Sequence, residues 1–154
     1  MSRSDLVNLG SLKLNIMENF NHFTATASAV QELLRDGHFT SEQLIQVYLS
    51  EIDKNNVYLH ALTSMPPREW LFEEARRLDQ ERRDGKKIGL LHGIPILIKD
   101  IVDTEPSMNM STTWGSLSLA GTHPQRNARV IDMLREAGAL ILAKTSLSEW
   151  GWFR

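Results

Sequence analysis

Apolar residues in the first half of the chain recur at steps of three and four, the spacing of one face of a helix. A first helix is expected from near Ser28, because Ser28 and Gln31 have capping-box spacing and Gly37 is a natural end. A second helix is expected after Thr40, which has the same spacing to Gln43. Its apolar face comprises Leu44, Ile45, Tyr48, Leu49 and Ile52.

A third helix is expected to open at Pro66-Pro67, since proline is favoured in the first helical turn, and to end near Gly85. Before it, Tyr58 to Thr63 favours a short extended segment. The outer face of the third helix, Arg68 to Arg83, mixes charges of both signs. Such mixing is typical of a solvated face with ion pairs one turn apart, rather than of a binding patch.

After Gly89 the pattern changes to short, continuous apolar runs. Ile94 to Ile98 and Ala139 to Leu142 are typical of parallel strands that are buried on both faces. Between them, Asn127 can cap a helix that ends at Gly138. Strand, long loop, helix and strand make a crossover unit, which predicts an α/β fold.

Composition narrows the class of protein. The chain has 154 residues, 42% hydrophobic and 23% charged, which suits one globular domain. A formal charge of -2 disfavours a nucleic-acid partner, and the absence of cysteine excludes disulfides, zinc-thiolate sites and a cysteine nucleophile. Residues 1–10 have no signal-peptide pattern and no apolar run is long enough to span a bilayer, so a cytoplasmic protein without a membrane partner is expected.

Lys99 is the sharpest candidate for chemistry, because it ends a buried strand, where ligands bind in open α/β sheets. By position alone, a structural ion pair of Lys99 with Asp100 or another acid is favoured over a neutral lysine base. Asp100, Asp103 and His92 are too few to predict a metal site. Lys144 ends the second strand in the same way, and a structural lysine that pairs with a neighbouring acid is the favoured interpretation.

Three ordered motifs resemble the amidase-signature family. Residues 90–103, LLHGIPILIKDIVD, resemble the segment around its catalytic lysine, and residues 111–116 resemble its Thr-Thr-x-Gly-Ser loop. Residues 128–150 resemble the helix and strand that follow. The resemblance implies the N-terminal part of that family's mixed β-sheet core, flanked by helices and incomplete. Residues 24–154 then form a partial amidase domain, and residues 1–23 a weakly structured arm.

The resemblance implies that Lys99 is the base of a Ser-cisSer-Lys triad that hydrolyses a small amide, with no cofactor and no metal. Both serines of the triad are expected beyond this chain, since Ser111, Ser116, Ser146 and Ser148 do not match their contexts. The resemblance assigns Lys144 a structural role. Ile101, Ala143 and Asn127 depart from the usual pattern without touching Lys99, and Trp114 is larger than the residue usual in its loop, so it either narrows a pocket or only packs.

Two functions therefore stand side by side, with a small independent ligand-binding domain as a weaker third. In the first, the chain belongs to a carboxamide hydrolase and is inactive alone, because two triad members are missing. In the second, it is a non-enzymatic half-domain that associates with itself or with a C-terminal partner chain, since a partial sheet leaves strand edges open.

Overall fold

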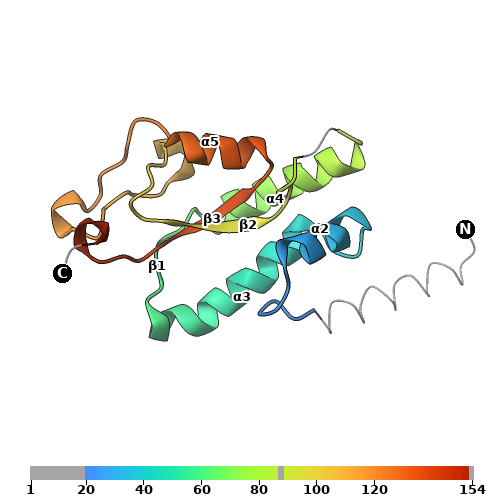
Figure 1. Ribbon diagram of the computed structural model, residues 1–154, viewed down its shortest axis with the longest axis horizontal. Helices are drawn as coiled ribbons and strands as arrows, with labels where there is room; N and C mark the ends of the chain where they lie inside the picture. The colour runs from blue at the N-terminus through green and yellow to red at the C-terminus, as the bar shows by residue number, and fades with distance from the viewer. Residues whose placement is uncertain (1–19, 87–88, 153–154) are drawn as a thin grey trace, which may run out of the picture.

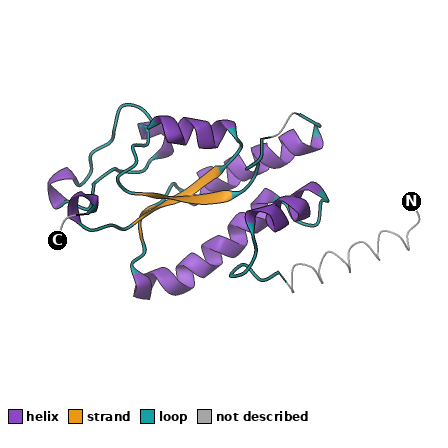
Figure 2. Cartoon of the chain, viewed as in Figure 1, coloured by secondary structure: helices purple, strands orange, loops and turns teal. Residues whose placement is uncertain are grey.

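The computed structural model describes residues 20–86 and 89–152, which form a small mixed sheet between helices (Figures 1 and 2). The strand order is β1-β3-β2. The strands are β1 (Leu62–Ser64), β2 (Pro95–Lys99) and β3 (Leu140–Thr145). The α-helices are α2 (Ala27–Arg35), α3 (Ser41–Leu59), α4 (Arg68–Arg83) and α5 (Arg129–Glu136). Short 3-10 turns are η1 (Pro106–Met108), η2 (Leu117–Leu119) and η3 (Glu149–Gly151).

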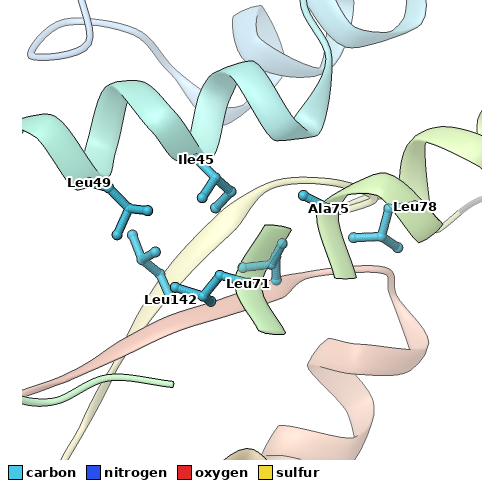
Figure 3. Close-up of a cluster of buried hydrophobic side chains, with 7 residues drawn as sticks. Ile45, Leu49, Leu71, Ala75, Leu78 and Leu142 are labelled. Carbon is cyan, nitrogen blue, oxygen red and sulfur yellow. The ribbon is translucent and has the colours of Figure 1, made fainter. Parts of the chain in front are cut away.

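Alternate residues of β3 face two different parts of the core. Leu140 and Leu142 pack against α3 and α4, in a cluster with Ile45, Leu49, Leu71, Ala75 and Leu78 (Figure 3). Ile141 packs on the other side, with Ile131 of α5 and the loop residues Met108 and Met110. β3 is thus buried on both faces, as its continuous apolar run predicted.

The parallel pair of strands confirms the predicted crossover unit. β2 runs parallel to β3, from the pair Pro95 and Leu140 to the pair Lys99 and Thr145. The carboxyl ends of both strands therefore meet at one edge of the sheet. β2 is less buried than expected, since Leu97 is 47% exposed. β2 lies at the end of the strand order, so no strand among the described residues pairs with its outer edge.

The helix starts show where local patterns succeed and fail. The capping box of Thr40 and Gln43 is present at α3. The first helix is instead capped by Thr26, whose hydroxyl accepts from Ala29 N, so the expected cap at Ser28 is wrong. Asn127 does not cap α5 either, because the N-cap residue is Ala128.

The other boundaries follow from longer-range contacts. α3 continues through Tyr58 and Leu59, so the expected extended segment shortens to β1. α4 begins after Pro67 and ends before Gly85, as predicted. Gly138 ends α5 with φ +85°, and a Cβ there would lie 2.7 Å from His92 Cα, so glycine satisfies both the turn and the close approach. Of the expected arm, residues 1–23, the first 19 lie outside the described residues.

Candidate active site

Lys99 lies at the carboxyl end of β2, where its side chain is exposed. Its Nζ donates a hydrogen bond to the carbonyl oxygen of Gly151, at 3.2 Å. Gly151 follows β3, so this contact joins the segments that leave the two parallel strands. The position is the one that α/β sheets use for ligands.

Asp100 points the opposite way and is fully buried. Its Oδ2 accepts hydrogen bonds from the backbone N–H of Thr113, at 3.2 Å, and from the Thr113 hydroxyl. Its Oδ1 is buried and accepts no hydrogen bond from the described residues. The carboxylate therefore does not form the ion pair with Lys99 that position alone favoured. It fixes the Thr-Thr-x-Gly-Ser loop to the end of β2.

Lys144 is the most unexpected side chain of the site, because it is a fully buried lysine in β3. Its Nζ donates to the hydroxyl of Thr112. Burial lowers the pKa of Lys144 to about 8, and the charges of Asp100 and Asp103 oppose that shift. Lys144 is thus attracted by the charges of Asp100 and Asp103, as the expected pairing with an acid requires. Its hydrogen bond, however, goes to the hydroxyl of Thr112.

A lysine with a lowered pKa beside a hydroxyl has the elements of nucleophilic catalysis. Thr112, however, is only 2% exposed, and Lys144 is not exposed at all. A substrate cannot reach either atom in this arrangement. Lys144 and Thr112 therefore stabilise the structure around the site and are not reacting groups.

Two Trp-Gly pairs lie together beside Lys99. Trp114 and Trp150 both have positive φ, at 53° and 58°, and each is followed by a glycine with positive φ. The backbone N–H of Trp150 donates to the carbonyl oxygen of Trp114, at 2.7 Å, and the ring centroids are 6.1 Å apart. Trp114 thus packs against Trp150. Positive φ in bulky residues is uncommon and marks a tightly determined turn.

The serines of this region do not serve Lys99. The hydroxyl of Ser116 donates to Glu149 Oε1, at 2.9 Å, and lies 3.0 Å from the hydroxyl of Ser118. Within the described ranges, no serine hydroxyl is hydrogen-bonded to Lys99 Nζ. Ser116 and Glu149 line a shallow pocket together with Gly115, Leu117, Ser118 and Trp150.

The residues weighed as metal ligands are held apart. His92 is buried, and its Nε2 lies 2.9 Å from the carbonyl oxygen of Leu78. No group of three or more His, Asp or Glu residues among the described positions could hold a metal ion. The described helices also include none that is long and apolar enough to cross a membrane.

Comparison with known proteins identifies the family. A sequence model of the Amidase family matches residues 43–154, and the chain belongs to this family. A probable amidase of Arabidopsis thaliana is 35% identical over 155 residues, which cover all of this chain and 30% of the relative. One subunit of the glutamyl-tRNA(Gln) amidotransferase of Chloroflexus aurantiacus is 36% identical over 134 residues, 87% of this chain and 26% of that one.

Solved structures agree in fold. The peptide amidase from Stenotrophomonas maltophilia superposes with a TM-score of 0.74 at 39% identity, covering 82% of this chain and 26% of that one. An amidase family protein from Bacillus anthracis gives a TM-score of 0.73 at 30% identity and is covered to 30% of its chain. The predicted amidase-signature fold is therefore confirmed, and the chain spans about a third or less of the relatives it matches.

Proposed function

We propose that this chain is part of an amide C–N hydrolase in which Lys99 is the base. The observation that carries the proposal is the position of Lys99. Its amine is exposed at the carboxyl end of β2, in the Lys-Asp motif, with the 112–116 loop fixed beside it by Asp100. The family match over residues 43–154 supports both the reaction class and the partial amidase domain at 24–154.

The proposed reaction needs Lys99 in its neutral form. The lysine amine takes the proton of a serine hydroxyl, through a second serine that bridges them, and the serine oxygen attacks the amide carbon. Backbone N–H groups stabilise the oxyanion, and the amine leaves with a proton. Water then hydrolyses the acyl-enzyme to a carboxylate and restores the serine.

We further propose that the chain alone does not turn over amides. Lys99 Nζ contacts a carbonyl oxygen here, and the two serines implied by the family pattern have no counterpart among the described residues. Removing members of a catalytic unit costs several orders of magnitude in rate. Purified chain incubated with acetamide or benzamide should release no ammonia above the blank. Rapid release that Lys99→Ala abolishes would overturn this part of the proposal.

A chimera tests the reaction class itself. This chain replaces the matched N-terminal segment of the Stenotrophomonas maltophilia peptide amidase, which supplies the remaining residues. Because the two segments share 39% identity and the same fold, the chimera should fold and hydrolyse an amide. A chimera with the circular dichroism spectrum and melting behaviour of the parent amidase, but without hydrolysis, would count against the proposal.

The alternative function is a non-enzymatic half-domain that binds a second chain. Two features favour it: the outer edge of β2 has no partner strand in the described part, and a groove of about 340 Å³ lies between α3 and the sheet. The groove is lined mainly by apolar side chains of α3 and the sheet, among them Ile52, Leu59, Leu62, Leu97 and Leu142. Open strand edges and apolar grooves favour association. Size-exclusion chromatography with light scattering tests it, and a well-folded monomer would count against it.

We also propose a substrate class and a cellular location. The family match supports a small amide as the substrate, and the near balance of charges argues against a nucleic-acid partner. The absence of cysteine fits a reducing compartment, and we propose the cytoplasm. Localisation of the tagged chain by fluorescence microscopy tests the second point.

A further inference from the structure

Two buried charged side chains, at the strand ends next to Lys99, have no part in the proposed reaction. Asp100 and Lys144 are both fully buried, and they come from the adjacent ends of β2 and β3. Buried charges are expensive unless hydrogen bonds and opposite charges compensate them. The contacts of this pair should therefore show what their burial accomplishes.

The two side chains hold neighbouring residues of one loop. Lys144 Nζ donates to the hydroxyl of Thr112, while Thr113 donates to Asp100 through its backbone N–H and its hydroxyl. The Thr113 hydroxyl also accepts from the backbone N–H of Gly115, at 3.2 Å. The chain of bonds thus runs from the middle strand, through the loop, to the end of β2.

The same strand end carries Lys99. The backbone N–H of Asp100 donates to the carbonyl oxygen of Thr145, at 3.2 Å, and that of Val102 donates to the carbonyl oxygen of Lys99, at 2.9 Å. These two bonds bracket Lys99. An Asp100 carboxylate that moved would pull on both bonds and on the backbone from which the lysine extends.

We propose that Lys144 is a positioning residue for Lys99: it holds the 112–115 loop through Thr112, and its charge compensates the Asp100 carboxylate that anchors the same loop beside Lys99. Asp100 Oδ1 accepts no hydrogen bond from the described residues, and the charges of Asp100 and the Lys144 amine attract each other, so loss of the amine removes one compensation of the carboxylate. The inference rests on the proposed function only in treating Lys99 as the functional amine.

A double-mutant cycle on the 154-residue chain tests the proposal by amide hydrogen exchange at pH 7. Lys144→Met leaves the Asp100 charge uncompensated, so the Asp100 and Val102 amides should exchange about tenfold faster or more. Asp100→Asn should have an effect of the same kind. The double variant should exchange more slowly than the two single effects added together would predict, because neither charge is then left alone, although the hydrogen bond to Thr112 stays lost. Effects that simply add would overturn the proposal.

A second pair of variants keeps the test valid if Lys144→Met does not fold. Thr112→Val removes only the hydroxyl that Lys144 holds, whereas Thr112→Ser retains a hydroxyl. Exchange at the Thr113, Gly115 and Val102 amides should be faster in the valine variant and restored in the serine variant. Equal protection in both variants would overturn the link through Thr112.

Two controls distinguish a local change in hydrogen exchange from global destabilisation and from failure of the proposed function. The amides of Leu49 and Leu78, in the core between α3 and α4, should keep their protection in every variant that folds. No substrate is used, so the exchange result stands whether or not Lys99 is a base. If the chimera lost hydrolysis while the Lys144 and Asp100 variants still showed non-additive exchange, only the proposed function would be rejected.

Discussion

The buried position of Lys144 predicts a specific dependence of stability on pH. The pKa of its amine falls from 10.5 in the exposed state to about 8 in the folded chain. Between these two values the unfolded chain binds more protons on this residue than the folded chain does. The free energy of unfolding should therefore rise with pH in that window, by about 2.5 kcal/mol from pH 7 to pH 10 for this residue alone.

Urea unfolding followed by far-ultraviolet circular dichroism measures this rise at pH 7, 8, 9 and 10. The comparison is with Lys144→Met, which lacks the titrating amine and should not show that component. Burial also raises the pKa of Tyr48, which acts in the opposite sense above pH 10 and is common to both proteins. Equal pH dependence in the two proteins would refute the reasoning. The ¹³C shift of Lys144 Cε, with a midpoint near pH 8, gives an independent check.

Three further predictions concern the frame that holds the site. Leu71→Ala removes a fully buried side chain from the main core cluster and should lower the free energy of unfolding by about 2–5 kcal/mol in urea titrations, whereas an unchanged midpoint would contradict that packing. Thr40→Ala breaks the capping box of α3 and should cost about 0.5–2 kcal/mol by the same assay, with Thr40→Ser near wild type. Gly138→Ala should lower the melting temperature, because φ is +85° and the new Cβ would meet the backbone of His92. A variant as stable as wild type would exclude this close approach.

Local patterns predicted the elements, whereas contacts between distant residues decided the site. The Thr40–Gln43 capping box and the two parallel strands could be predicted because neighbouring residues determine them. The burial of Lys144 could not, since its partner Thr112 lies 32 residues away in a loop without periodicity. A lysine directly after a continuous apolar run was the available signal.

Asn127 shows the same limit at a helix start. Its side chain fits the cap pattern, yet its Oδ1 accepts from the backbone N–H of Glu105, at 2.8 Å, and its Nδ2 donates to Asp132. The backbone N–H of Ala128 is held by the carbonyl oxygen of Asp103. The long loop thus determines how α5 begins, and the loop's course could not be read from local spacing.

The role of Lys99 is tested most directly in the chimera with the peptide amidase. Lys99→Ala should reduce its rate of amide hydrolysis by about 10²–10⁴-fold, the usual contribution of a general base, with the melting temperature unchanged. Lys54→Ala, at an exposed lysine of α3 that pairs with Glu51, is the matched control and should keep full activity. Equal activity in the two variants would contradict the assignment of Lys99 as the base.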